Sequence, residues 1–436
     1  MDSIYMNNFR GFSETVVPIR AVNFLVGENS TGKSSFLALA QLLSQHEFWF
    51  NLDFNSGNYE FGGYRDIVSA LSKDQEEFQI GVCKETGKKG DAPTYYLLHF
   101  REAKDGATEL ARFSQLTKKY LTTLRFTDDA LAAAVTANPS VFSSTSCCHH
   151  ECFAFLQQSA HSTSLDYKAL KEDETRFLRH APIPSFPGIV ARLFDDKAMR
   201  NSIESFPFPS LAMSFAGMAP IRTTPKRTYD GYTKRFSPEG EHTPYVIREK
   251  LPVGKTVTNE FKTALDAFGR DSGLFESVGI TQFGTDTAAP FELTVTLGAK
   301  PLRVNSVGYG VSQVLPVVVE LLTRGKKSWL SIQQPEVHLH PKAQAALGDV
   351  LFHASIEDGQ TLLVETHSDY LMDRFRLCMH DHKHPSEFAQ VVYFERIADG
   401  NRVFPMVLEK DGEYPEDQPV GFRHFFLSEQ KRILGV

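Results

Sequence analysis

The chemistry most clearly marked in this sequence lies in the glycine-rich loop at residues 27–34, GENSTGKS. It fits the pattern G-x-x-x-x-G-K-[ST] at every fixed position. Glycines let several backbone N–H groups converge on one anion, while Lys33 would reach the β- and γ-phosphates and the Ser34 hydroxyl would ligate magnesium. The loop therefore predicts a site for ATP and Mg²⁺; an ordinary glycine turn is the alternative. The residues expected around the phosphates are Asn29, Ser30, Thr31, Gly32, Lys33, Ser34 and Ser35.

The segments on either side of this loop are the ones that a phosphate site requires. Residues 21–26 form an apolar run typical of a buried strand, and residues 35–43 have the pattern of a helix. A helix that starts at the loop adds the partial positive charge of its N-terminus. The expected order is therefore strand, glycine loop, helix.

Later stretches of the chain carry further polar groups next to predicted elements. Residues 305–316, NSVGYGVSQVLP, form a glycine-spaced turn that opens a helix, and this is a second candidate anion site. Residues 328–332 predict a buried strand that leads into QQPEVHLHP at residues 333–341. Residues 361–365 predict the next core strand, which is followed by Thr-His-Ser.

Length and composition describe a soluble globular protein of the cytoplasm. The chain has 436 residues, 42% of them hydrophobic and 23% charged, and its net charge of −7 excludes a surface coated in basic residues. Five cysteines are too few for a disulfide scaffold in a chain of this length. The apolar run at residues 311–322 is broken by Gln313, Pro316 and Glu320, so we expect neither secretion nor a membrane span.

The opening of the chain adds a family resemblance to these motifs. Residues 8–12 read NFRGF, and a short strand and the glycine loop follow. With the later motifs in this order, the chain resembles the ATP-binding-cassette (ABC) type heads of RecF-like, SMC-like and OLD-nuclease-like ATPases. The resemblance implies an α/β fold, a P-loop NTPase head with a mainly parallel sheet flanked by helices and an inserted α+β lobe. It divides the chain into residues 1–74 with the P-loop, an inserted helical or α+β lobe at 75–213, and the rest of the head at 214–436.

The inserted lobe is expected to be compact. Residues 78–83 and 95–100 predict paired strands, whereas residues 109–124 and 128–136 predict helices. No apolar heptad lasts three repeats, which argues against a long coiled coil. The glutamine that contacts magnesium in such heads cannot be placed near residues 61–68.

The same resemblance implies which residues contact the nucleotide. In these heads a signature loop binds the γ-phosphate of a nucleotide held by the opposite subunit, a role that falls here to Gly308, Gly310 and Ser312. We also expect Arg10, in the opening motif, to bind ATP. His367 matches the switch histidine at the end of a core strand, whose ring senses the γ-phosphate.

The Walker B element departs from the family pattern. Relatives place a carboxylate for magnesium at the position of Gln333 and a glutamate or glutamine at that of Gln334. An amide oxygen cannot accept the proton of an attacking water, and a missing general base slows hydrolysis by about 10²–10⁴-fold. Glu336 is the nearest carboxylate and is the expected substitute. His338 and His340 are either a metal pair or, as the resemblance implies, part of a subunit interface.

Basic residues interleaved with aromatic ones between residues 214 and 236 predict either a contact with DNA or RNA or a structural loop. These basic residues are Arg222, Lys226, Arg227, Lys234 and Arg235.

A second open question is whether the cluster Cys147, Cys148, His149, His150 and Cys152 binds a metal, because adjacent ligands do not easily converge on one tetrahedral ion.

Taken together, these features predict an ATPase that forms a homodimer or higher oligomer around nucleotide and acts as a switch. The sequence leaves no room for a Toprim nuclease after residue 367, so an effector such as a nuclease is expected on a separate chain. Bacterial anti-phage defence systems of the Septu or retron type pair ATPase and effector in this way. The alternatives are a scaffold that holds ATP with little turnover and a RecF-like DNA repair factor.

Overall fold

The structure is a computed structural model of the chain. The chain forms two compact units. The N-terminal unit consists of Met1–Ile19, Glu28–Met213 and Phe394–Val403, and the C-terminal unit of Arg20–Gly27, Ser214–Tyr393 and Phe404–Val436. The residues that the structure describes are 2–56, 60–71, 76–85, 92–127, 131–137, 139–143, 148–162, 165–169, 182–186, 190, 210–212, 214–231, 235–251, 260–286, 288–298, 300–422 and 431–432.

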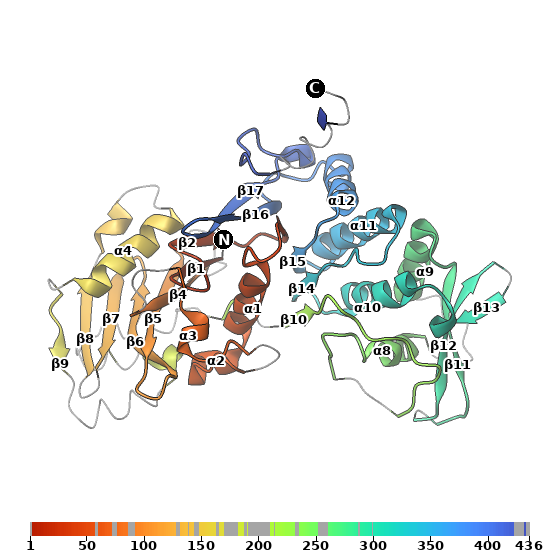
Figure 1. Ribbon diagram of the computed structural model, residues 1–436, viewed down its shortest axis with the longest axis horizontal. Coiled ribbons are helices and arrows are strands. Elements are labelled where there is room, and N and C mark those ends of the chain that lie inside the picture. Colours follow the sequence, from red (N-terminus) through yellow and green to blue (C-terminus); the bar gives the residue numbers. More distant parts are fainter. Residues whose placement is uncertain are drawn as a thin grey trace. The chain divides into compact units, whose positions relative to one another are not determined.

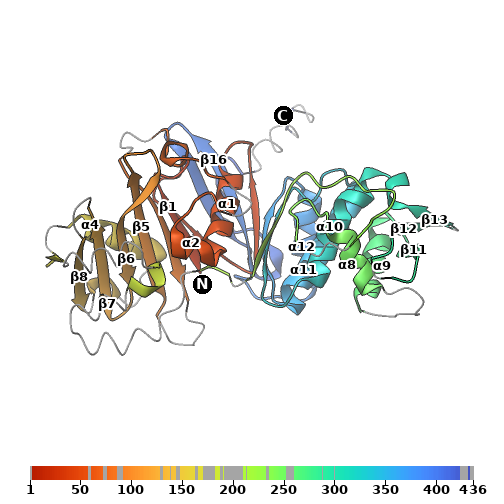
Figure 2. The ribbon, with the colours of Figure 1, turned by 90° about the horizontal axis from the view of Figure 1, so that it is seen from below.

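The N-terminal unit is built on an antiparallel sheet in the order β2-β1-β4-β5-β6-β7-β8-β9 (Figure 2). Because β1 pairs with both β2 and β4, the residues after position 75 continue the sheet that the N-terminus begins. The domain boundaries at 74/75 and 213/214 stay predictions. The strands are β1 (Ser3–Asn7), β2 (Thr15–Pro18), β4 (Phe78–Lys84), β5 (Thr94–Glu102), β6 (Thr108–Leu116), β7 (Tyr120–Phe126), β8 (Leu131–Ala137) and β9 (Lys168–Ala169).

The helices predicted at residues 109–124 and 128–136 are wrong, because strands β6, β7 and β8 lie there. The prediction depended on apolar residues at helix-like spacing. These strands lie inside a wide sheet, and much of β6 and β7 is buried on both faces, so the alternation that marks a half-exposed strand is absent there. In β6, the last four residues, Phe113 to Leu116, are all buried.

Both faces of this sheet are covered. Helix α4 (His149–His161) packs on one face (Figure 1). There the ring of Phe153 stacks on Tyr5 with centroids 4.8 Å apart. Strand side chains alternate between the faces, and on the opposite face Phe78 and Phe100 stack at 5.2 Å. The other helices of the unit are α1 (Lys33–Ser44), α2 (His46–Asn51) and α3 (Tyr64–Ile67).

The C-terminal unit holds the parallel sheet that the sequence predicts. The strand order is β10-β14-β15-β3-β16-β17, and the first four strands pair in parallel. Their buried Val, Ile, Leu and Phe side chains enter one hydrophobic core with the surrounding helices. The strands are β3 (Val22–Gly27), β10 (Phe215–Met218), β14 (Trp329–Gln333), β15 (Thr361–Glu365), β16 (Ala389–Ile397) and β17 (Gly400–Val407). Residues Phe394–Val403 of β16 and β17 belong to the N-terminal unit.

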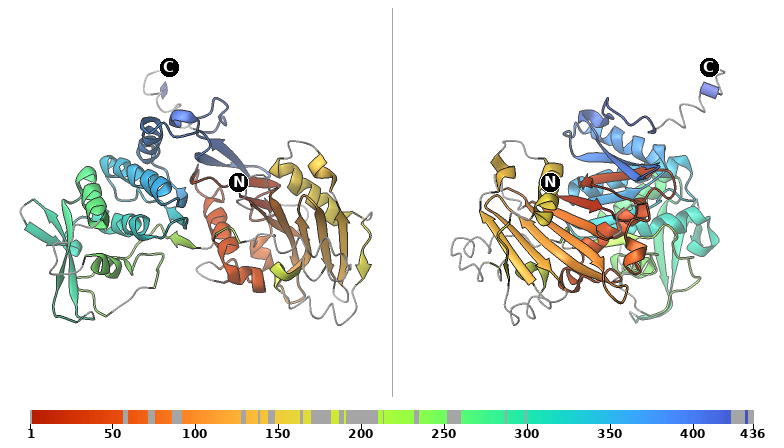
Figure 3. Two further views of the ribbon diagram at one scale, coloured as in Figure 1. Left: turned by 180° about the vertical axis from the view of Figure 1, so that it is seen from behind. Right: turned by 60° about the vertical axis from the view of Figure 1, so that its left-hand side comes forward.

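Helices and a small sheet complete this unit. The three-stranded antiparallel sheet of β11 (Ser277–Gln282), β12 (Phe291–Leu297) and β13 (Lys300–Arg303) packs beside helix α9 (Glu260–Ser272), as Figure 3 shows. The remaining helices are α8 (Thr243–Lys250), α10 (Tyr309–Thr323), α11 (Pro341–Glu357) and α12 (Asp369–Asp381). Within the described residues, none of the helices combines the length and hydropathy that crossing a bilayer requires.

Candidate nucleotide site

The glycine loop has the backbone shape that its sequence predicts. It leaves β3 at Gly27, and Ser30 and Gly32 adopt positive φ angles of 61° and 94°. Helix α1 begins directly afterwards, at Lys33. A Cβ atom on Gly32 would come within 2.4 Å of the Phe12 ring, so both the backbone angle and the packing require glycine there.

Polar groups of the loop fold back onto one carbonyl. The Lys33 ammonium donates to the Glu28 carbonyl at 2.7 Å, and the Thr31 hydroxyl donates to the same oxygen at 2.8 Å. Asn29, Ser30 and Ser34 are exposed. The exposed Ser34 hydroxyl in the first turn of α1 and the N–H groups of the turn are of the kind that bind phosphate and magnesium.

Arg10 contacts backbone carbonyls. Its Nη2 donates to the Phe61 carbonyl at 2.8 Å and its Nε to the Asp66 carbonyl at 3.2 Å. Burial lowers the pKa of Arg10, an effect that the charge of Asp66 opposes. In this structure Arg10 therefore fixes the segment around α3, and its contact with a nucleotide stays a prediction.

In the C-terminal unit, the carboxyl ends of β3, β14 and β15 lie side by side. Gln333 is in register with Glu365, and Glu365 is in register with Leu25, two residues before the glycine loop starts. Ligands of open α/β sheets bind at the carboxyl ends of the strands. The fold thus brings the Walker B-like strand, the strand that ends at His367 and the strand that enters the P-loop to one edge.

Glu336 is held by the residues that follow β15. Its Oε2 accepts a hydrogen bond from the Thr366 hydroxyl at 2.9 Å, and its Oε1 accepts one from the His367 backbone N–H at 2.7 Å. Gln334 has a positive φ of 45°, and its N–H donates to the Glu365 carbonyl. His367 is exposed. The structure therefore brings Glu336, Gln334 and His367 together.

Sequence reasoning missed two residues of this edge. Thr366 orients Glu336, and Glu365 supplies a carboxyl group on the strand next to Gln333. Both residues belong to the stretch Glu-Thr-His-Ser at 365–368, in which the resemblance assigns a role to the histidine alone.

The assignment of Arg222 to a nucleic-acid surface is wrong. Only 4% of this residue is exposed, and its Nη2 donates to the Gln333 carbonyl at 2.9 Å. Burial lowers the pKa of Arg222 to about 10, while the charge of Glu336 opposes this shift. Arg222 is therefore a buried cation beneath the Walker B-like strand.

The other basic residues of that segment differ in their surroundings. Lys226, Arg227 and Arg235 are exposed. Lys234 lies outside the described residues. A contact of Lys226, Arg227 and Arg235 with DNA or RNA stays a prediction.

The signature-like turn opens helix α10. Gly308 is its exposed N-cap residue, with space around the position of a Cβ atom. Gly310 is buried, and a Cβ atom there would come within 2.9 Å of the His338 carbonyl. The Ser312 hydroxyl donates to the Tyr309 carbonyl at 2.9 Å. Gly308 is therefore exposed at the helix N-terminus. The absence of a side chain at Gly310 allows the loop after β14 to pack against helix α10.

Residues of the two candidate metal clusters, His340 in one and Cys148 and Cys152 in the other, contribute to local structure. The ring of His340 caps helix α11 by accepting from the Lys342 N–H at 3.3 Å. Glu151 accepts from the Cys148 N–H at the start of α4, and Cys152 is buried. Among the described residues, neither cluster brings three metal-ligating groups together. Cys147 lies outside the described residues.

Two protein-family models match this chain. Residues 1–172 match the family described as "AAA ATPase domain", and residues 258–373 match the one described as "AAA domain, putative AbiEii toxin, Type IV TA system". Both models describe AAA-type ATPase domains, and each covers less than half of the chain. The resemblance to ABC-type ATPases and the expected P-loop NTPase fold are thereby confirmed.

Solved structures similar to this ATPase include heads of SMC proteins. An SMC head bound to the C-terminal winged-helix domain of ScpA is 12% identical, with a TM-score of 0.43, over 93% of this chain and 97% of that one. An SMC head with an extended coiled coil, bound to the C-terminal domain of ScpA from Pyrococcus furiosus, is 11% identical, with a TM-score of 0.43, over 99% and 100%. The SMC head from Thermotoga maritima is 10% identical, with a TM-score of 0.34, over 92% and 97%. No curated protein matches the ATPase.

Proposed function

We propose that this ATPase binds Mg²⁺–ATP through residues 29–35 and acts as a nucleotide-dependent switch. The observation that carries the proposal is the shared edge of the parallel sheet, where Gln333, Glu365 and the end of β3 lie side by side. Magnesium prefers oxygen ligands, and the Ser34 hydroxyl and the Gln333 amide oxygen are both of this type. When bound, Mg²⁺–ATP supplies the phosphoryl group that water attacks.

Hydrolysis is proposed to be slow and to depend on Glu336. Gln333 and Gln334 cannot accept a proton from water, whereas Glu336 is a carboxylate fixed by Thr366 and by the His367 N–H. Each oxygen of Glu336 keeps a further lone pair for a water molecule. His367, exposed beside it, is proposed to respond to the γ-phosphate.

The switch is proposed to work through a homodimer or a higher oligomer. The exposed N-terminus of helix α10 supports this, because Gly308 leaves it open to an anion. We propose that it binds the γ-phosphate held by a second copy of the chain.

A closed dimer would control a separately encoded effector such as a nuclease, or a DNA transaction. The proposed setting is anti-phage defence in the bacterial cytoplasm.

The test compares ATP binding and phosphate release in the native chain and in Lys33→Ala. Lys33→Ala should lose tight binding and turnover together, because the ammonium group that faces the phosphates is gone. Lys326→Ala, which changes an exposed lysine outside the site, is the matched control and should keep both. Equal binding of ATP by Lys33→Ala and the native chain would contradict the proposal.

A second candidate function is favoured by Gln333 and Gln334. A chain that binds ATP tightly, loses binding in Lys33→Ala and releases no phosphate would be a nucleotide-holding scaffold. The same pair of measurements therefore separates the switch that hydrolyses ATP from the scaffold.

A further inference from the structure

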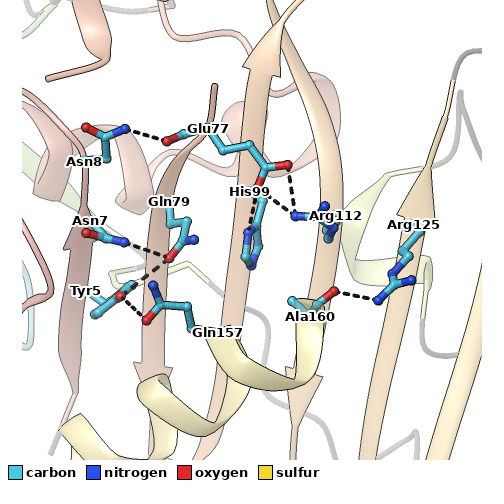
Figure 4. Close-up of polar contacts among 10 residues, drawn as sticks. All are labelled: Tyr5, Asn7, Asn8, Glu77, Gln79, His99, Arg112, Arg125, Gln157 and Ala160. Atoms are coloured by element: carbon cyan, nitrogen blue, oxygen red, sulfur yellow. Dashed lines mark hydrogen bonds and ion pairs between the residues drawn. The ribbon is translucent and has the colours of Figure 1, made fainter. Parts of the chain in front are cut away.

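A polar cleft in the N-terminal unit lies next to a group of metal-ligating side chains. The cleft has a volume of about 470 Å³ and is lined by polar residues that include Glu77, Arg112, Gln157 and His161. Figure 4 shows Glu77, His99 and Arg112 meeting on neighbouring strands, with Ala160 at the end of helix α4 close by. This part of the molecule has no role in the nucleotide chemistry proposed above.

Three side chains in this region are placed to share one ion. One ligand atom each from Glu77, His99 and His161 lies within 4.8 Å of the other two. The Nδ1 atom of His99 is 3.4 Å from Oε2 of Glu77. Two ligands of a tetrahedral zinc ion, each at its usual bond length, are about 3.3 Å apart. The spacing of Glu77 and His99 therefore fits two ligands of one ion.

His99 is a buried imidazole with one nitrogen left over. Its side chain has no exposed area; Nδ1 faces the Glu77 carboxylate at 3.4 Å, and Nε2 has no hydrogen-bond partner among the described residues. A buried polar group without a partner costs about 1–3 kcal/mol. An ion bound to His99 would satisfy one ring nitrogen.

The surrounding residues hold the other two ligands in place. Arg112 Nη1 donates to both oxygens of Glu77, at 2.9 and 2.7 Å. A carboxylate has about four lone-pair sites, so Glu77 can bind a metal while Arg112 orients it. Arg125 donates to the carbonyls of Ala160 and Ser162 at 2.9 and 2.8 Å, which fixes the end of α4 where His161 lies.

We infer that Glu77, His99 and His161 form a binding site for a divalent transition-metal ion of the zinc class. Two imidazoles and one carboxylate are a ligand set of zinc sites that keep a fourth position for water or substrate. His161 is exposed and lines the cleft, so that fourth position faces the cleft. The ion would also tie the end of α4 to strand β5.

The test is zinc binding by the full-length chain after removal of metals with a chelator. Titration against a competing chromogenic chelator should show one tight zinc site per chain, and Co²⁺ should give the visible absorption of a tetrahedral N/O complex. His161→Ala should weaken zinc binding by at least about 10–100-fold. His161 is exposed, so this variant should fold, and Glu77→Gln tests the second ligand without changing side-chain size.

His353→Ala is the matched control, because it removes an exposed histidine of another helix, α11. It should bind zinc like the native chain. The proposal is overturned if His161→Ala and Glu77→Gln bind zinc like the native chain, if His353→Ala loses binding equally, or if the native chain binds zinc only adventitiously. A thermal shift with zinc that is present in the native chain and absent in His161→Ala would support it independently of ATP binding.

Discussion

At the scale of single residues, Glu336 and Gln334 follow strand β14, where the proposed hydrolysis needs a general base. Glu336 accepts hydrogen bonds from Thr366 and from the His367 N–H, whereas Gln334 follows β14 directly in a left-handed conformation. Glutamate tolerates that conformation about as well as glutamine, since the two side chains have the same shape. Position 334 is therefore open to a direct test of the missing general base.

Gln334→Glu is expected to raise the rate of ATP hydrolysis. The new carboxylate can accept the proton of the attacking water, and such a group contributes about 10²–10⁴-fold. Steady-state phosphate release at saturating ATP is the measurement. The double variant Lys33→Ala, Gln334→Glu should lose the gain, which would show that turnover occurs at the P-loop. An unchanged rate in Gln334→Glu with ATP bound would place the base elsewhere.

Substitutions at Arg222 and Arg227 are expected to distinguish an effect on stability from an effect on nucleic-acid binding. Arg222→Met removes a buried donor to the half-buried Gln333 carbonyl and should lower the free energy of unfolding by about 1–3 kcal/mol. Arg227→Gln changes an exposed side chain and should stay within about 0.5 kcal/mol. Urea denaturation of both variants measures this difference.

The same two variants test the contact with DNA. If the exposed basic residues bind phosphates, Arg227→Gln should reduce the slope of log affinity against log salt by about 1, and Arg222→Met should leave it unchanged. The opposite pattern would mean that Arg222 becomes accessible in solution.

These arginines show how much of the site the sequence could predict. Ordered motifs were enough to find the loop at residues 27–34 and the polar ends of β14 and β15, because each follows a strand with a clear apolar run. The motifs could not show that Arg222 is buried. A basic residue beside aromatic ones has the same local pattern whether its charge faces solvent or a backbone carbonyl, and only long-range packing decides between them.

At the scale of elements, helix α10 carries a buried carboxylate whose charge affects stability. Glu320 accepts hydrogen bonds from Arg324 at 2.8 Å and pairs with His242 at 2.6 Å. Burial alone raises the pKa of Glu320, but the hydrogen bond from His242 and the charge of Arg324 outweigh it, so the pKa of Glu320 is lowered. A lowered pKa in the folded state stabilises the protein above the unfolded-state value, about 4.3 for glutamate.

Glu320→Gln is therefore expected to destabilise the fold at neutral pH by about 3–5 kcal/mol, as loss of a buried charged partner does. The difference from the native chain should shrink as pH falls below about 4.3, because Glu320 then takes up a proton. Chemical denaturation across this pH range measures it. Glu357→Gln, at an exposed residue of α11, is the control and should show little difference at any pH. A constant difference down to the acid transition would contradict the assignment.

The elements of the two units were not equally predictable. Strands β3, β14 and β15 are short apolar runs bounded by polar motifs, and the sequence predicts them correctly. Strand β10 lies in the segment 214–236, for which the sequence predicts a structural loop or a nucleic-acid contact. Strands β6, β7 and β8 were predicted as helices because Ala, Leu and Glu occur among them and much of β6 and β7 is buried on both faces. Their strand conformation is fixed by pairing with neighbours in the sheet, which a single segment does not reveal.

At the scale of the whole molecule, the proposed switch depends on a second copy of the chain. The N-terminus of α10 carries partial positive charge, and Gly308 leaves it exposed. If this end binds a γ-phosphate held by another copy, its charge should govern ATP-dependent association. Substitutions at Gly308 test this point cleanly, because its φ of −60° suits any residue and nothing lies within 4 Å of the added Cβ atom.

Gly308→Asp and Gly308→Asn should differ in ATP-dependent dimerisation. Both residues are good N-caps with similar effects on helix stability, but only aspartate places a negative charge beside the phosphate. The native chain and Gly308→Asn should shift to a dimer with Mg²⁺–ATP in sedimentation velocity, whereas Gly308→Asp should need a protein concentration about tenfold higher, a change of about 1.4 kcal/mol in association. ATP binding by the monomers, measured at low protein concentration, should be equal in both variants. Equal dimerisation of the two variants would show that this helix end does not contact the nucleotide of a second chain.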